Sequence, residues 1–342
     1  MVLVEKPEEL RHGGAPIYSI SCSPCGERLA TVGGDQRVKV WGVGEVVQGL
    51  KQAARRRLAA ADPGGGQAEA HKEGGGGGRE PAPAPKLLAT LASHAAPVNC
   101  AAFSQNGRWL ATGADDHLVQ VHELRPGEAP HASTFGSGDQ ASLEHWTKWL
   151  TFTGHKNNVT DLAWSPDDSM VASCSLDNTV RVWSVGRASQ VAVFEDHSSF
   201  VKGVVWDPLG KYLASQSDDK SVVVWAIDGW QRVARVEEPF RKALDNTFST
   251  RLAWSPDGSS LTAMNAYQPI VERRRAGESE KKKKGGEGGG TRDWRHTAAV
   301  LSRGSWERSH DFVGHRAPVV AASFNPHLFR LTRSEEHTSE LQ

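Results

Sequence analysis

The sequence predicts an all-β fold made of repeated four-stranded sheets. Short runs in which apolar and polar residues alternate, as at 159–164 and 201–206, are typical of β-strands with one buried face. Turn sequences separate these runs, as SPDD does at 165–168 and DPLG at 207–210. The same order of strands and turns recurs after about 42 residues. One supersecondary unit is therefore repeated along the chain.

Fixed spacings accompany the repeat. Cys22, Phe103, Trp164 and Trp206 each lie 13 residues before an aspartate. A histidine precedes each of these four positions by 9 or 10 residues, and a Ser or Thr lies four residues before each aspartate. Three of the four aspartates are followed, six residues later, by a tryptophan. Offsets that recur together in this way indicate residues with the same position in successive units.

The unit resembles the WD40 repeat, in which four short strands form one blade of a β-propeller. The resemblance implies that a His, a Ser or Thr, an Asp and a Trp form a hydrogen-bonded set inside each blade, with a structural role. The expected sets are His12, Thr31, Asp35 and Trp41; His94, Thr112 and Asp116, with His122 in place of Trp; His155, Ser173, Asp177 and Trp183; and His197, Ser215, Asp219 and Trp225. A buried carboxylate needs such partners, because without them its burial costs several kcal/mol.

The propeller is expected to occupy residues 1–330 and to be incomplete. Blades are expected at about 12–45, 86–125, 146–186 and 187–229, with a fifth from 251 and part of a sixth over 311–326. Members of the WD40 family that this chain resembles have seven blades, so the sheet edge at the C-terminal end should be open. The last ten residues, 333–342, resemble no blade and are interpreted as a non-native tail derived from a sequencing adapter.

Two inserts are expected to be disordered. Segments 43–85 and 272–292 are rich in Gly, Ala, Pro or Lys and cannot bury a core. Their basic runs at 55–57, 273–275 and 281–284 leave three readings open: contact with DNA, nuclear import, or a solvated loop.

Composition and motifs argue against several kinds of chemistry. Lys+Arg and Asp+Glu both number 40, so overall charge gives no argument for nucleic-acid binding. Cys22 and Cys25 form a C-x-x-C pair without a second pair, and Cys25 takes a turn position that is Asp in other repeats. We therefore expect no catalytic residues, no metal, no cofactor, no small-molecule substrate and no membrane segment. The chain is predicted not to be an enzyme.

Longer stretches carry a closer resemblance. They include STFGSGDQASLEHW at 133–146, HSSFVKGVVWDPLGKYLASQSDDKSVVVW at 197–225, DGWQ at 228–231 and DFVGHR at 311–316. They resemble the N-terminal propeller of the HIRA (histone regulator A) family of histone chaperone subunits. VKGVVWDPLGKYLAS, at 201–215, is also similar to the medium subunit of chromatin assembly factor one, a replication-coupled assembly factor. The other stretches favour HIRA.

The HIRA resemblance implies a nuclear WD-repeat scaffold that acts through protein–protein interactions. It implies replication-independent nucleosome assembly and transcriptional regulation, including repression. The expected partners are other subunits of a histone chaperone complex and, directly or indirectly, core histones on chromatin. A WD40 adaptor or signalling scaffold unrelated to chromatin stays open as an alternative of another class.

Overall fold

The computed structural model describes residues 10–44, 85–127, 142–244, 247–270 and 293–324. The two inserts, apart from Val43, Gly44 and Pro85, and the tail at 333–342 lie outside these described residues. The chain divides into two compact units, residues 1–151 and 152–342. No helix in the described residues is long and apolar enough to cross a bilayer.

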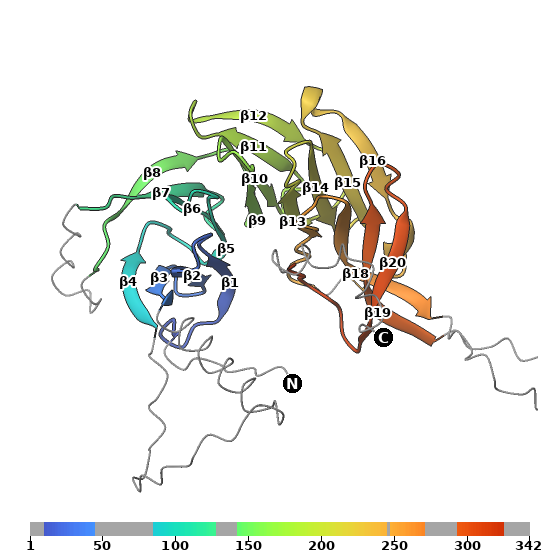
Figure 1. Ribbon diagram of the computed structural model, residues 1–342, viewed down its shortest axis with the longest axis horizontal. Helices are drawn as coiled ribbons and strands as arrows, with labels where there is room; N and C mark the ends of the chain where they lie inside the picture. The colour runs from blue at the N-terminus through green and yellow to red at the C-terminus, as the bar shows by residue number, and fades with distance from the viewer. Residues whose placement is uncertain (1–9, 45–84, 128–141, 245–246, 271–292, 325–342) are drawn as a thin grey trace, which may run out of the picture. The chain divides into compact units, whose positions relative to one another are not determined.

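The first unit contains two four-stranded antiparallel sheets (Figure 1). The first sheet has the order β1 (Ile17–Cys22), β2 (Arg28–Gly33), β3 (Val38–Gly42) and β4 (Lys86–Leu91). The second has β5 (Val98–Phe103), β6 (Trp109–Ala114), β7 (Val119–Leu124) and β8 (Trp146–Phe152). Their shared core includes Val32, Val40 and Phe103.

The second unit contains three further sheets of the same kind. The third has β9 (Val159–Trp164), β10 (Met170–Ser175), β11 (Val180–Ser184) and β12 (Ser189–Phe194). The fourth has β13 (Val201–Trp206), β14 (Tyr212–Ser217), β15 (Ser221–Ala226) and β16 (Arg232–Val236). The fifth has β17 (Ala253–Trp254), β18 (Ser260–Ile270), β19 (Asp293–Ser302) and β20 (Arg308–His315). The prediction of an all-β fold from repeated four-stranded sheets is confirmed.

The turn between the second and third strands of a sheet places the aspartate of each expected set. The residue after the aspartate has a left-handed backbone, with φ of 69° at Asn178 and 66° at Lys220. The carboxylate then folds back along the turn, so that Asp177 accepts the backbone N–H of Thr179 at 3.0 Å. Asp219 accepts that of Ser221 in the same way, at 3.0 Å. Asx turns of this type fix the side chain that the site uses.

The expected blade limits are wrong by one strand. In the first three sheets the outer strand comes from the beginning of the next predicted segment: β4 at 86–91, for example, completes the first sheet and does not begin the second. In the fourth sheet it is β16, at 232–236, which lies between two predicted segments. Likewise β20, at 308–315, is the fourth strand of the fifth sheet, whereas a sixth blade was expected to begin at 311. Strand alternation gives the position of a strand but not its partner, which explains the error.

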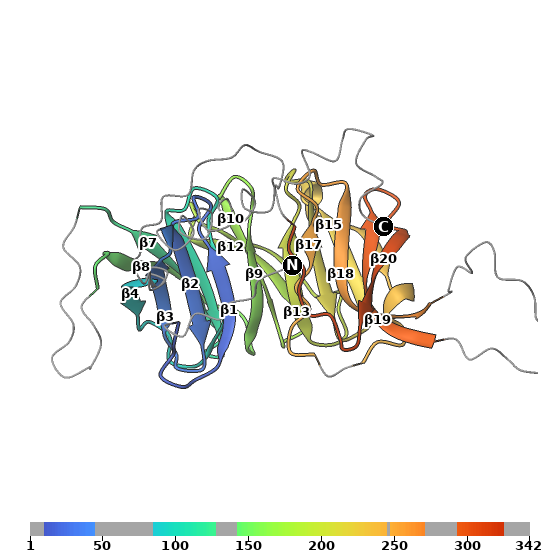
Figure 2. The same cartoon turned by 60° about the horizontal axis from the view of Figure 1, so that its bottom comes forward.

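The fifth sheet differs from the others because its middle strands are long. β18 and β19 have 11 and 10 residues, against 5 or 6 in the second and third strands of the other sheets (orange to red in Figure 2). They pair as far as Ile270 and Asp293, on either side of the expected insert. β19 was not predicted, because no repeat offset continues across the insert.

Candidate functional site

The third sheet brings together all four residues of its expected set. His155 lies 2.9 Å from Asp177 through Nδ1 and 2.8 Å from the Ser173 hydroxyl through Nε2. The indole N–H of Trp183 donates to the same hydroxyl at 2.8 Å. The four side chains come from four segments, since His155 precedes β9, Ser173 lies in β10, Asp177 in the turn that follows and Trp183 in β11.

The hydrogens in this set are ordered by the chemistry of its members. A carboxylate only accepts, so His155 must carry its hydrogen on Nδ1 and donate it to Asp177. In the neutral ring Nε2 then accepts the hydrogen of Ser173, whose oxygen is left to accept from Trp183. Both ring nitrogens of His155, the hydroxyl of Ser173 and the indole N–H of Trp183 then have partners. This order satisfies buried polar groups, which are costly when left unpaired.

The first sheet has the same arrangement. His12 lies 2.7 Å from Asp35 and 2.8 Å from Thr31, and the indole of Trp41 donates to Thr31 at 2.8 Å. Burial lowers the pKa of His12, although its hydrogen bond to Asp35 acts in the opposite direction. A neutral His12 ring can donate from Nδ1 to Asp35 and accept the hydrogen of Thr31 at Nε2, as His155 does in the third sheet.

The second sheet keeps three members and changes the fourth. His94 lies 2.8 Å from both Asp116 and Thr112. His122 occupies the tryptophan position but pairs with Ser93 at 2.9 Å, not with Thr112. His122 is fully enclosed, and this burial, with a smaller effect from His94, lowers its pKa to about 3. It is therefore a neutral side chain at physiological pH.

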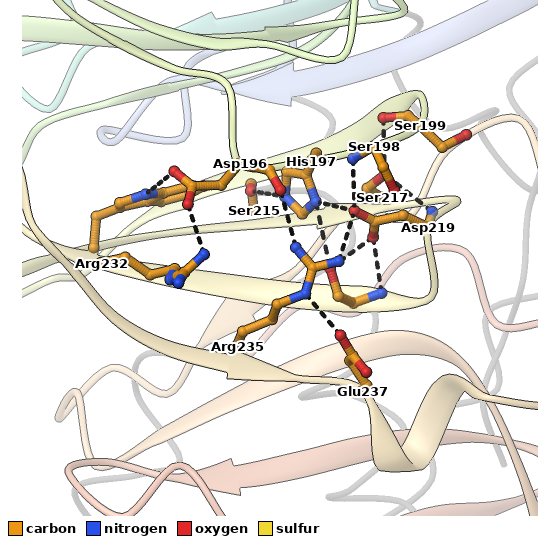
Figure 3. Close-up of polar contacts among 12 residues, drawn as sticks. Asp196, His197, Ser198, Ser199, Ser215, Ser217, Asp219, Arg232, Arg235 and Glu237 are labelled. Carbon is orange, nitrogen blue, oxygen red and sulfur yellow. Dashed lines mark hydrogen bonds and ion pairs between the residues drawn. The ribbon is translucent and has the colours of Figure 1, made fainter.

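The fourth sheet also departs from the expected set. His197 lies 2.8 Å from Asp219 and 2.7 Å from Ser215, as expected. The indole of Trp225, however, points to Asp196 at 3.4 Å, so its expected place in the hydrogen-bonded set is wrong. The fourth sheet also has an additional arginine in its network (Figure 3). Arg235 donates to the Asp219 carboxylate at 3.2 Å and to the backbone carbonyl of Asp196 at 2.9 Å.

The residue immediately before the histidine accounts for both departures. This residue is Ser93 in the second sheet and Asp196 in the fourth. The ring nitrogen of His122 bonds to the Ser93 side chain, and that of Trp225 to the Asp196 side chain. In the third sheet the position is Gly154, which has no side chain to offer, and Trp183 bonds to the hydroxyl instead. The sequence shows these residues, but we did not include this position, or Arg235, among the expected site residues.

The carboxylates of the sets in the third and fourth sheets are held ionised by their partners. Burial alone would raise the pKa of Asp177, but hydrogen bonds from His155, the backbone of Lys156 and Thr179 hold it well below its ordinary value. For Asp219 the same balance applies, with His197 supplying the largest opposing contribution to its low pKa. Hydrogen bonds to the charged form stabilise that form.

The sets have the residue types of a catalytic triad but not its accessibility. The hydroxyl-bearing residues Thr31, Thr112, Ser173 and Ser215 are fully buried. A nucleophile must reach the atom it attacks, so these hydroxyls cannot act on a substrate in this state. Among the described residues, no group of three or more His, Cys, Asp or Glu could hold a metal ion. Cys22 and Cys25 are both exposed.

No such set is present among the described residues of the fifth sheet. Tyr267 stands where the aspartate would be, 13 residues after Trp254. It stacks on Trp294 with ring centroids 5.7 Å apart, and the ammonium of Lys242 lies 4.0 Å from the Trp294 centroid. The indole nitrogen of Trp254 has no hydrogen-bond partner among the described residues, and the ring packs against Trp306. Aromatic packing replaces the polar set at this position.

Comparison with known families decides the relationship. The CAF1B/HIR1 beta-propeller domain matches residues 79–273, and the WD40 domain (G-beta repeat) matches residues 7–42. The chain belongs to the CAF1B/HIR1 beta-propeller family. The resemblance to HIRA and the β-propeller fold class are confirmed.

Individual relatives agree with this family. Protein HIRA of Oryza sativa subsp. japonica is 42% identical over 96% of this chain and 28% of its own length. Protein HIRA of Homo sapiens is 36% identical over 95% of this chain and 27% of its own length. The chain therefore spans less than a third of these relatives. A chain in the crystal structure of a mitotic checkpoint complex shares the fold, with a TM-score of 0.58, 18% identity, and coverage of 93% of this chain and 71% of that chain.

Proposed function

We propose that this CAF1B/HIR1-family propeller is a WD-repeat scaffold of a histone chaperone complex. It acts in the nucleus, in replication-independent nucleosome assembly and transcriptional regulation, by binding other chaperone subunits and, directly or indirectly, core histones. The observation that carries the proposal is the 42% identity to a protein named HIRA across 96% of the chain. The fully buried hydroxyls of the His–Asp sets support a binding role without catalysis.

The same family model also carries the name CAF1B, which keeps one rival function in view. That rival is the medium subunit of chromatin assembly factor one, which would act during replication. A WD40 adaptor unrelated to chromatin is the alternative of another class.

Depletion of the natural protein in its own cells separates these functions. After depletion, deposition of newly made histones is measured with DNA synthesis running and with DNA synthesis blocked. We expect deposition to fall in blocked cells and to return when the protein is restored. A fall confined to replicating cells would favour the replication-coupled rival. Co-purification of ubiquitin-ligase subunits without histones or histone chaperones would favour the adaptor.

A further inference from the structure

A groove of about 550 Å³ lies between the fourth and fifth sheets. One wall is β16 with the residues that follow it, over 233–239. The other is the turn between β19 and β20 with the first residue of β20, over 304–308. β16 and β20 are the end strands of their sheets (Figure 1). Both walls belong to the described part of the chain, and the groove follows the edge of a sheet.

The bottom of the groove is apolar. Trp306 is only 8% exposed and belongs to the core that the two sheets share. Ala234 and Val236 pack against this core from β16. The Trp306 ring makes edge contacts with Tyr212 and Trp254, at centroid distances of 5.1 and 6.0 Å. An apolar side chain of a ligand would therefore pack on a ring that is already in place.

Contacts between the two sheets hold the walls of the groove. Arg303, in the β19–β20 turn, pairs with Asp207 of the β13–β14 turn through hydrogen bonds of 2.7 and 3.0 Å. Asp207 is fully buried. Gln268 of β18 donates to the Pro239 carbonyl at 2.8 Å, which ties the β16 wall to the fifth sheet. A groove that is formed before binding loses less conformational entropy than a mobile one.

The backbone of β16 itself lies at the groove. Four consecutive residues of this strand, 233–236, line it, whereas alternate side chains of a strand point to opposite faces of the sheet. The strand edge must therefore contribute to the wall. β16 pairs with β15 on one side, and among the described residues no strand pairs with its other side. Such an edge can accept an added strand through main-chain hydrogen bonds.

Glutamates outnumber arginines among the lining residues. Glu237, Glu238 and Glu307 line the groove, and all three are exposed. Arg235 and Arg308 are the lining cations. The Glu307 side chain has no ion pair or hydrogen bond among the described residues, so its charge is available to a ligand.

Both arginines already have carboxylate partners. Arg235 turns towards the polar set of the fourth sheet, where it contacts Asp219 at 3.2 Å, and it pairs with Glu237 at 2.7 Å (Figure 3). Arg308 pairs with Asp311 at 3.1 Å. An anionic ligand would have to displace one of these carboxylates, whereas a cationic ligand would not.

We propose that this groove binds an extended, basic segment of a partner protein, which adds as a strand to the edge of β16. An apolar side chain of the segment packs on Trp306, and Lys or Arg side chains lie near Glu238 and Glu307. Charge complementarity at the rim favours this ligand over an acidic peptide or a nucleic acid. The inference rests on the proposed function only in placing the segment in another protein of the same complex.

Selection from a random peptide library displayed on phage tests the proposal with the whole chain. We expect a class of peptides in which Lys or Arg alternates with apolar residues. Their affinity should be about tenfold lower for Glu238→Lys/Glu307→Lys, which reverses two exposed charges at the groove. Glu238→Gln/Glu307→Gln should lower the affinity in the same direction but by less.

The matched control is Glu195→Lys/Asp228→Lys, which changes the net charge of the chain equally at exposed residues outside the groove lining. It should leave the affinity unchanged, and thermal melts verify that every variant is folded. A loss of affinity as large in this control would overturn the proposal, because binding would then follow net charge and not the groove.

Hydrogen exchange measured by mass spectrometry tests the mode of binding. Saturation with a selected peptide should slow the exchange of backbone amides over 232–236. The proposal is overturned if exchange there is unchanged, if no selected peptide depends on the two glutamates, or if the dependent peptides are acidic. None of these measurements concerns histone deposition, which tests the proposed function separately.

Discussion

The third and fourth sheets have the same residue types in the same register but distribute their hydrogen bonds differently. In the third, one chain runs from Trp183 through Ser173 and His155 to Asp177. In the fourth, the indole of Trp225 leaves this chain for Asp196. The tryptophan itself is buried in both sheets. Its hydrophobic contribution is thus kept while its polar contact is exchanged.

The comparison shows which contacts a sheet of this kind requires. Both sheets keep the His–Asp and the His–hydroxyl contacts at 2.7–2.9 Å. Only the indole contact changes, and it changes where a carboxylate precedes the histidine. A charged acceptor makes a stronger hydrogen bond than a hydroxyl does, which offsets the long distance of 3.4 Å.

The largest effect is expected from removing the carboxylates. Asp177→Ala leaves the buried His155 N–H and the backbone N–H groups of Lys156 and Thr179 without this acceptor, so we expect the free energy of unfolding to fall by about 3 kcal/mol. Asp219→Ala should cost more, because Arg235 also loses a partner. Urea denaturation of the two variants measures both losses.

The exposed Glu195, next to Asp196, provides the control for these carboxylates. Glu195→Ala should change the free energy of unfolding by less than about 0.5 kcal/mol. Equal losses for Asp177→Ala and Glu195→Ala would contradict a structural role for the set.

The second sheet supplies a pH-dependent test of the same comparison. His122 has a folded-state pKa of about 3, below its ordinary 6.5, so the unfolded chain binds the proton more readily. Its contribution to stability is complete above pH 6.5 and is lost as the pH falls towards 3. At pH 5 the loss is about 2 kcal/mol. His122→Phe should remove this part of the pH dependence, measured by urea denaturation between pH 7.5 and pH 5.

His310→Phe is the control for the pH experiment, because His310 is exposed in β20. It should leave the slope of stability against pH unchanged. If His122→Phe shows the wild-type slope, burial of a neutral His122 is not the source of the acid sensitivity. The carboxylates act at lower pH: with their folded-state pKa values depressed, the stability that Asp177 and Asp219 contribute is present above about pH 4 and lost below it.

The sequence predicted the sheets and most of the site because both depend on local spacing. Alternation locates strands. The offset of four residues between Ser173 and Asp177 places the two residues near the same end of a sheet, and it does not depend on the inserts or on neighbouring sheets. The partner of Trp225 could not be obtained in this way. The choice depends on how far the Trp225 indole N–H lies from each of two possible acceptors, Ser215 and Asp196. Tertiary packing sets these two distances.

The fifth sheet marks the other limit of prediction. Its strands β18 and β19 pair across an insert whose length follows no repeat. The sequence itself shows Tyr267 in place of the aspartate, 13 residues after Trp254. The stacking of Tyr267 on Trp294 has no fixed offset to reveal it. Long-range pairs of this kind follow from strand pairing and not from the periodicity of one segment.

A smaller effect is expected when the competing acceptor is removed. In Asp196→Gly, the Trp225 indole should turn to Ser215 and reproduce the third sheet. The free energy of unfolding should change by about 1 kcal/mol or less, because one hydrogen bond replaces another. The measurement is the NMR signal of the Trp225 indole N–H, which should move towards that of Trp183. An unmoved signal would mean that the backbone of the fourth sheet, and not Asp196, directs the tryptophan.

The smallest effect is expected from Arg232, which pairs with Asp196 at 2.7 Å while half of its side chain is exposed. Exposed ion pairs are screened by water and salt, so Arg232→Ala should lower the free energy of unfolding by about 0.5 kcal/mol, and by less at high salt. The Trp225 indole signal should stay in place, since Asp196 keeps its contacts to Trp225 and Arg235. If the signal moves as it does in Asp196→Gly, the exposed arginine positions the carboxylate, and the difference between the two sheets begins at the surface.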